Sequence, residues 1–366
     1  MKAARAWAPV AAVTLGPFAV SSAPTVAATP GTEHAAVTRA APPATPAPTL
    51  ADTGLFLDGS PDRIHPDNLE FTPQYSLWSD GATKRRWLNL PAGTYIDAIR
   101  PDAWEFPPGT RLWKEFSVDG RRIETRLIER RADKSWSYLS YVWNADGSNA
   151  VLVPARGVAL SDIGGPAGRY LIPSRGDCVA CHEGAAVPVL GFSAVQLSRE
   201  RDPSTEVLAD RSLVDLEGLV AKGLLRNLPP AWLVQPPQIA ARSTVERAAL
   251  GYLHANCGHC HNHNGSPAAV RLVLAQTAVS PEESRERVLR SAVLARSSFR
   301  PPGASGEVLL IAPGRPQDSM IDWRMRSRHP LRQMPPLGTL VPDPDGTDLI
   351  ARWISTDLQP PQESSK

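Results

Sequence analysis

The chain has 366 residues, of which 42% are hydrophobic and 21% are charged. This is enough apolar material for two or three ordinary domains. Basic residues number 39 and acidic residues 37, and this near-balance argues against a nucleic-acid partner, because binding a phosphate backbone needs a basic face. No run of about 18 apolar residues occurs, so the sequence predicts no transmembrane segment in the mature chain.

The N-terminus has the pattern of a Sec-type signal peptide. Lys2 and Arg5 form a short basic region, and residues 8–20 form an apolar region too short to cross a bilayer. Small residues at 26–28 then offer a cleavage site, although the sequence leaves the exact bond open. We therefore expect residues 1–28 to be a signal peptide and the mature chain to be periplasmic or otherwise exported.

The rest of the chain divides into parts by composition. Residues 29–50 are rich in Pro, Ala and Thr and lack the aromatic and β-branched density that a core needs, which predicts a disordered linker. We expect a β-rich domain over 51–172, a segment with the first cysteine pair over 173–240, a compact helical domain over 241–358 and a disordered tail at 359–366. The predicted fold class is therefore α+β and multidomain, with an antiparallel β-rich domain followed by a mainly α-helical region.

The β-rich prediction depends on aromatic density and on alternating sequences. Residues 111–118 and 122–130 alternate roughly with period two, and residues 137–143 are aromatic and β-branched. Asp119-Gly120 and Asp146-Gly147 supply turns. Six of the ten tryptophans lie here, and we expect them to pack the core: Trp78, Trp87, Trp104, Trp113, Trp136 and Trp143.

Two helices are predicted from apolar residues at helical spacing. One lies near Ser212–Leu225, and the other spans Asp348–Leu358. The segment that begins at Asp343 superficially resembles a calcium loop, but the rest of the twelve-residue pattern is missing, so we interpret it as a turn and an N-cap. The inward residues of the second helix are Leu349, Ile350, Trp353 and Ile354.

A third helix is predicted to begin at Ser243 and to run to the second cysteine pair. Ser243-Thr-Val-Glu246 is a capping box, which satisfies free backbone N–H groups at a helix start. Gly251 lies inside this helix, where glycine costs about 1 kcal/mol relative to alanine, so we expect another segment to approach the backbone there. The predicted inward face contains Val245, Ala249, Tyr252 and Leu253.

All four cysteines belong to two copies of one pattern, Cys178-Val-Ala-Cys181-His182 and Cys257-Gly-His-Cys260-His261. Two cysteines at i and i+3 project to one side of a helical turn, so their sulfurs can bond the two vinyl groups of one haem, and the adjacent histidine can ligate the iron. The sequence therefore predicts two covalently bound haem c groups, with His182 and His261 as proximal iron ligands.

Three other interpretations of the cysteines compete with haem. A structural zinc site would need both pairs to converge on one ion, and more than seventy residues separate them. A thioredoxin-like pair needs one Cys-x-x-Cys on a βα unit and does not require the following histidine. A disulfide within each pair would close a tight and unfavourable loop. Two copies of the full pattern, in an exported chain with no other cysteine, favour haem.

Met334 is the predicted sixth ligand of the second haem. It lies in Gln333-Met-Pro-Pro-Leu-Gly-Thr339, where two prolines stiffen the segment and order the thioether in advance. A thioether sulfur is soft and neutral, and it raises the haem potential. The alternative is that Met334 fills a gap in the core; Met320 and Met325, in an apparent helix over 318–326, are interpreted as packing residues of that kind.

Residues 243–358 resemble a class I cytochrome c domain, with a helix that ends in the haem motif, a Met-Pro-Pro-Leu-Gly strap and a closing helix. More loosely, residues 51–358 resemble a group of exported bacterial dihaem c-type proteins. In that group a β-rich section precedes the first haem motif, which stands in an Ile-Pro-Ser-Arg setting, here Ile172-Pro-Ser-Arg-Gly-Asp-Cys178. The resemblance implies a cytochrome c-type haem region after the β-rich domain, and adds little about activity.

The first haem motif departs from the class I pattern. No capped helix is predicted to lead into Cys178, and the preceding stretch Gly164-Gly-Pro-Ala-Gly168 predicts a loop. No Met or His lies between residues 183 and 253. Its distal ligand therefore comes from elsewhere in the chain or is absent. The candidates are His65, His254, His259, His263, Met320 and Met325.

Two main functional classes follow from these sites. The first is an electron-transfer protein in which two haems pass electrons between redox partner proteins, and its small net charge suits transient docking. The second is an enzyme of the dihaem peroxidase or oxidase type, in which the methionine-ligated haem feeds electrons to an open first haem. A binding or sensing protein, with the β-rich domain as the recognition unit, is a weaker third.

Overall fold

The computed structural model describes residues 45–203, 213–264 and 271–359. The expected signal peptide and tail therefore lie outside the described residues, apart from Gln359, as does most of the linker. The last linker residues are ordered: Leu50 is fully buried, and the N–H of Leu152 donates to the Pro48 carbonyl oxygen. No helix in the described ranges is long and apolar enough to span a membrane.

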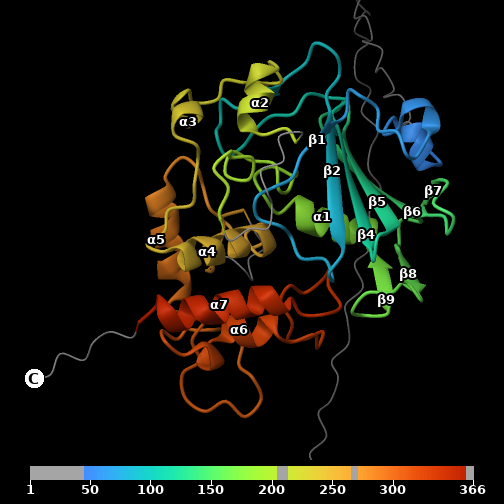
Figure 1. Cartoon of the computed structure of the whole chain (residues 1–366). Helices are drawn as coiled ribbons and strands as arrows, with labels where there is room; N and C mark the ends of the chain where they lie inside the picture. The colour runs from blue at the N-terminus through green and yellow to red at the C-terminus, as the bar shows by residue number, and fades with distance from the viewer. Residues whose placement is uncertain (1–44, 204–212, 265–270, 360–366) are drawn as a thin grey trace, which may run out of the picture. The chain divides into compact units, whose positions relative to one another are not determined.

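Six strands form an antiparallel sheet in the spatial order β1-β2-β4-β5-β6-β7 (Figure 1). Their bounds are Leu69–Glu70, Thr83–Asn89, Arg111–Val118, Arg121–Arg130, Trp136–Trp143 and Ala150–Leu152. Asp119 and Gly120 both adopt positive φ, 49° and 77°, which is the backbone that a tight hairpin turn between β4 and β5 requires. The predicted antiparallel β-rich region is confirmed.

Two small strand pairs flank this sheet. β8 (Val158–Ser161) pairs antiparallel with β9 (Arg169–Ile172), and β3 (Ile96–Asp97) pairs parallel with β10 (Leu225–Arg226). The last pair shows that the helix expected near Ser212–Leu225 is too long as predicted.

The helix found there, α2, covers only Leu216–Ala221. Gly223 has φ 69°, a left-handed conformation that ends the helix and redirects the chain into β10. Ser212, the expected start, lies outside the described residues.

The remaining helices follow along the second half of the chain (Figure 1). They are α1 (Arg175–His182), α3 (Ala231–Val234), α4 (Thr244–Asn256), α5 (Pro281–Ala292), α6 (Met320–Met325) and α7 (Pro344–Thr356). Short 3-10 helices cover Leu50–Thr53, Leu57–Gly59 and Pro316–Asp318. The mixture of sheet and helix is consistent with the predicted α+β class.

The capping predictions for α4 and α7 hold in part. The Ser243 hydroxyl accepts the Glu246 N–H at 2.9 Å, so Ser243 is the N-cap of α4. The Glu246 carboxylate does not return to Ser243; it accepts the Arg242 N–H and pairs with Arg285 of α5. The segment from Asp343 holds an N-cap as predicted, and the structure identifies it as Asp343 itself. The helix begins at Pro344, four residues before the predicted start, because proline suits a first helical turn.

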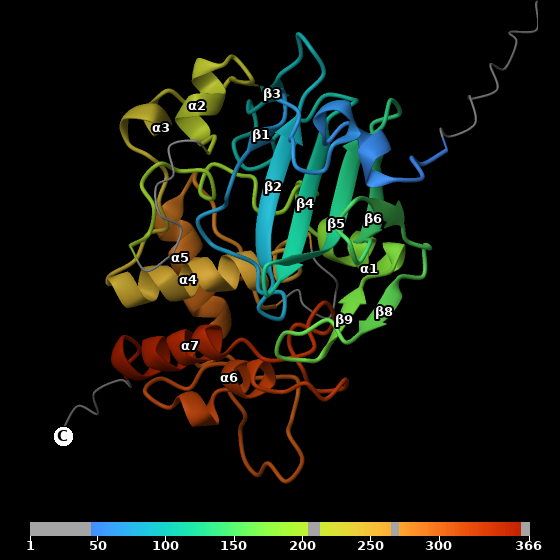
Figure 2. The same cartoon turned by 45° about the vertical axis from the view of Figure 1, so that its right-hand side comes forward.

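The two faces of the sheet contribute to different clusters. Trp87, Trp113 and Tyr141 lie on one face and pack with residues of the first 3-10 helices. Leu88 and Leu112 lie on the other face, in one continuous core with Leu253 and Trp353 of the helices. In both views the helices lie to one side of the sheet, with α1 beside it (Figure 2). The expectation that tryptophans pack the β-rich core is confirmed for Trp87, Trp104, Trp113 and Trp143, whereas Trp78 and Trp136 are half-buried.

Two glycines allow helices to approach aromatic rings. A Cβ at Gly251 of α4 would lie 2.0 Å from the ring of Tyr75, which confirms the close approach expected there. A Cβ at Gly346 of α7 would lie 2.3 Å from the ring of Tyr252 of α4. These contacts hold α4 between the β-rich part of the chain and α7.

Candidate functional site

The first Cys-x-x-Cys-His motif is itself helical. α1 begins at Arg175 behind the N-cap Ser174, whose hydroxyl accepts the Asp177 N–H at 3.1 Å. The Asp177 carboxylate accepts the Ser174 N–H at 2.9 Å, which completes a capping box. The expected loop at residues 164–168 is present between β8 and β9. The expectation that no capped helix leads into Cys178 is wrong, because the capping box at Ser174 starts the short helix that contains the motif.

In the described part of the chain no disulfide joins the four cysteines, and each of them is half-buried. Burial raises the pKa of Cys181 to about 11 and that of Cys257 to about 12. A redox-active Cys-x-x-Cys pair needs a lowered thiol pKa, so the environment of these cysteines disfavours the thioredoxin-like alternative. A pocket opens beside Cys178 and is lined by Tyr138, Pro154 and Arg175 among others.

The imidazole of His182 is oriented for use as a ligand. Its Nδ1 lies 2.6 Å from the carbonyl oxygen of Pro188, and when Nδ1 donates this bond the Nε2 lone pair is left for a metal. Desolvation lowers the pKa of His182 to about 4, so the ring is neutral at physiological pH. The ring also lies 5.2 Å from that of Tyr138 on β6. These features fit a proximal haem ligand.

The second motif follows α4 directly. The N–H of Cys257 donates to the Leu253 carbonyl oxygen at 2.9 Å, and the N–H of His261 donates to the Cys257 carbonyl oxygen at 2.8 Å, so the motif is a hydrogen-bonded turn directly after the end of α4. Gly258 is needed between the cysteines, because a Cβ there would lie 2.6 Å from the His254 carbonyl oxygen. The two cysteines and His261 therefore come from one tightly wound segment.

The fold brings the two motifs together, which the sequence did not predict. The side-chain amide of Asn262, next to His261, donates to the Gly184 carbonyl oxygen at 3.0 Å. A Cβ at Gly184 would lie 3.0 Å from the His259 carbonyl oxygen. His259 also helps to lower the pKa of His182 electrostatically, although burial is the main cause. Two haems bound here would be neighbours.

Met334 lies in the segment between α6 and α7. Its N–H bonds the Arg324 carbonyl oxygen at 3.0 Å, and Arg324 Nε donates to the Arg332 carbonyl oxygen at 2.9 Å, so α6 anchors the segment. The Met334 side chain is half-buried. These contacts position the segment, and the role of Met334 as an iron ligand stays a prediction.

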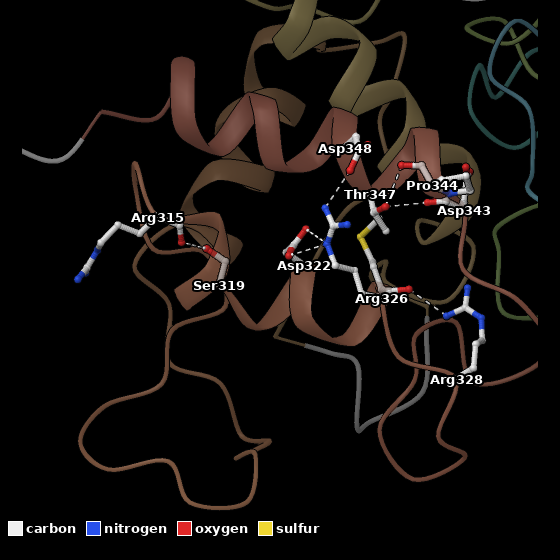
Figure 3. A network of polar contacts seen from close by, with 10 residues as sticks. Arg315, Ser319, Asp322, Arg326, Arg328, Asp343, Pro344, Thr347 and Asp348 are labelled. Atoms are coloured by element: carbon white, nitrogen blue, oxygen red, sulfur yellow. Dashed lines mark hydrogen bonds and ion pairs between the residues drawn. The ribbon is translucent and has the colours of Figure 1, made fainter.

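A polar network joins α6 to α7 near this segment (Figure 3). Arg326 Nε donates to both carboxylate oxygens of Asp322, at 3.1 and 3.0 Å, and an Arg326 terminal nitrogen donates to Asp348 at 3.1 Å. Because Asp348 lies on α7, the ion pairs fix the base of the methionine segment relative to the closing helix.

The candidates for the distal ligand of the first haem differ in their surroundings. His259 is the candidate that interacts electrostatically with His182. His254 Nδ1 accepts the Gln276 N–H at 3.1 Å, and His65 Nδ1 accepts the Asp67 N–H at 3.3 Å. Met320 and Met325 are buried, which confirms them as packing residues, and His263 is exposed.

A shared zinc ion would need ligands from both motifs around one point. Although the motifs meet, the described ranges hold no group of three or more His, Cys, Asp or Glu side chains arranged to bind a metal ion.

Comparison with known proteins found no matching family model, no matching curated protein and no matching solved structure.

Proposed function

We propose that this protein is a dihaem c-type cytochrome that transfers electrons between redox partner proteins. The observation that carries the proposal is the adjacency of the two Cys-x-x-Cys-His motifs, joined by the hydrogen bond from Asn262 to Gly184. Haem supplies a one-electron redox centre when bound. Two such centres held side by side suit the passage of an electron from one partner to the next.

Each motif residue has a distinct role in this proposal. Cys178 with Cys181, and Cys257 with Cys260, form the thioether bonds to the two haems. His182 and His261 are the proximal ligands, and the bond from His182 to the Pro188 carbonyl oxygen orients its ring and strengthens it as a donor. Met334 is the sixth ligand of the second haem. We also propose that the mature chain is exported, since thioether attachment suits the expected compartment.

Haem content tests the proposal directly. The mature protein is purified from a host that matures c-type cytochromes, weighed intact and assayed with alkaline pyridine. We expect the mass of two covalent haems and the matching haemochrome absorbance. Bare thiols, disulfides or bound zinc without porphyrin would contradict the proposal.

Two matched variants assign the haems to the motifs. Cys178→Ser with Cys181→Ser removes one haem, and Cys257→Ser with Cys260→Ser removes the other. Each variant is expected to retain a single haem, and N-terminal sequencing of the same preparations shows whether the expected signal peptide has been removed.

The spin state of the His182 haem distinguishes carrier from enzyme. The structure assigns no distal ligand to this haem, so the peroxidase or oxidase alternative remains the second candidate. Two low-spin haems without reactivity toward peroxide are expected for a carrier. A five-coordinate, high-spin component with peroxide-dependent turnover would favour the enzyme.

A further inference from the structure

The sheet face that lies toward the haem motifs contains an unusual row of cations. Arg86 of β2, Lys114 of β4 and Arg126 of β5 occupy consecutive register positions, because Arg86 is paired with Lys114 and Lys114 with Arg126. Lys84 stands two residues before Arg86 on the same face. Leu112 and Phe116, on either side of Lys114, are apolar and buried, so the alternation of β4 predicts an apolar residue where Lys114 stands.

Within the described part of the chain, most of these cations have no acidic partner. Arg86 is 5% exposed, and its side chain makes no hydrogen bond or ion pair. Lys114 likewise has neither, and its ammonium lies 4.9 Å from the centre of the Phe116 ring. Burying an unpaired charge is costly, so this face is incomplete without an anion.

The acidic groups nearby are already engaged. The Glu124 carboxylate pairs with Arg126 and accepts the Tyr170 hydroxyl at 2.8 Å. The Asp80 carboxylate accepts the N–H groups of Leu340 and Val341. Asp343 caps α7. Asp80 and Asp343 still act electrostatically on Lys84, and Glu124 acts on Lys114 as well as on Arg126. None of the three carboxylates forms an ion pair with Arg86 or Lys114 at the described residues, so these two cations are the ones without a direct acidic partner.

The row stands next to the first motif. α1 contacts β6, and the His182 ring lies 5.2 Å from that of Tyr138, which is on the same sheet face as Arg126. Ser140 of β6 continues the row, because it is paired with Arg126, and it lines the same pocket as Cys178.

We propose that Arg86 and Lys114 bind the propionate carboxylates of the haem attached to Cys178 and Cys181. The inference rests on the proposed function and gives the β-rich part of the chain a role, since its sheet then supplies the anion-binding wall of that haem site. Haem carries two carboxylates, and a paired cation–carboxylate arrangement satisfies both buried charges. Lys84 and Arg126 extend the same positive surface.

The test measures the potentials of the two haems and the infrared bands of the propionates. Lys114→Gln and Arg86→Gln are compared with Arg85→Gln, whose side chain is on the opposite sheet face and pairs with Glu70 at 2.7 Å. A cation near a haem opposes the ferric charge, so its loss lowers the potential. We expect both inner variants to keep two haems, to lower the potential of the His182 haem alone and to shift its carboxylate bands. Lys114→Arg should restore both readouts.

The outcomes separate this inference from the proposed function. If the unmodified protein carries no porphyrin, both fail together. If Lys114→Gln retains two haems and its carboxylate bands do not move, the inference is overturned and the proposed function stands. Binding of inorganic phosphate to the haem-loaded protein that is lost in Lys114→Gln would also overturn it, because the cations would then serve a free anion. If Arg86→Gln does not fold, the Lys114→Gln variant alone tests the inference, because Lys114 is only half-buried.

Discussion

Asn262 and Gly184 join the two Cys-x-x-Cys-His motifs through one hydrogen bond of 3.0 Å. The same Asn262 amide group lies 2.8 and 2.9 Å from the carbonyl oxygens of Gly258 and His259, so it also closes the turn that holds the second motif. Asn262 is buried. A single side chain therefore determines both the shape of one motif and its position against the other.

We expect Asn262→Ala to destabilise the fold by about 1–3 kcal/mol, because it leaves buried carbonyl oxygens without a donor. It should also weaken the interaction between the haems, measured as coupled circular dichroism in the Soret region. Asn264→Ala is the control, since only the backbone N–H of Asn264 takes part, at 2.7 Å from Asn262 Oδ1. Equal effects of the two variants would contradict the assignment.

Met334→Ala should lower the potential of one haem while both haems stay attached, because the soft thioether favours the reduced iron. The measurement is a potentiometric titration of the two haems. Met320→Ala is the matched control: Met320 is 3% exposed, so its loss should cost about 2–5 kcal/mol of stability and leave both potentials unchanged. An unchanged potential in Met334→Ala would refute its role as a ligand.

Gly346→Ala should destabilise the contact between α4 and α7 by about 1–3 kcal/mol, because the added methyl group would overlap the Tyr252 ring. Gly176→Ala is the control in α1, where the nearest atom to an added Cβ is 3.6 Å away. That change should be neutral or should stabilise by up to about 1 kcal/mol. The free energy of unfolding of both variants is measured by chemical denaturation, and equal values would contradict the expected overlap with Tyr252.

Arg285→Met should cost about 3–5 kcal/mol, since it leaves the Glu246 carboxylate buried without its partner. The pair joins α5 to α4 at 2.7 Å, with both side chains buried. Arg287→Met removes the more exposed pair with Glu283 on the same helix and should cost less than about 1 kcal/mol. If urea denaturation gives similar losses of unfolding free energy for the two variants, the buried pair stabilises the fold no more than the exposed pair does.

His254 should make the protein acid-sensitive. Burial lowers its pKa from 6.5 to about 4, so the unfolded chain binds the proton more readily and stability falls as the pH drops through this interval. The difference between the two pKa values limits the loss to about 3 kcal/mol. Protonation of Nδ1 also removes the acceptor for the Gln276 N–H.

Denaturation of His254→Gln at pH 7 and pH 4.5 checks this expectation. The variant should lose less stability on acidification than the parent protein. His329→Gln, which changes an exposed histidine, should behave like the parent. An unaltered pH dependence in His254→Gln would rule out His254 as the source.

Turns, helix caps and the buried faces of helices could be predicted from the sequence, because they depend on interactions between residues close together in the chain. Asp119-Gly120 specifies its turn by positive φ, Ser243 caps α4, and the apolar spacing of α7 places Ile350 and Trp353 in the core. The two Cys-x-x-Cys-His patterns predict haem attachment from the sequence alone. The expectation that no capped helix leads into Cys178 was wrong, because the capping residue Ser174 lies only four residues before this cysteine.

The tertiary structure alone decided which distant residues meet. Nothing in the sequence around Gly184 or Asn262 indicates that these residues bond, because contacts between distant segments depend on how the whole core packs. The inward position of Arg86 and Lys114 likewise follows from strand register, which pairs β2 with β4 and directs alternate residues to the face beside α1. The sequence determined the two Cys-x-x-Cys-His motifs, and the packing of sheet against helices determined that the two motifs adjoin and that a row of cations lies on the sheet face beside the first of them.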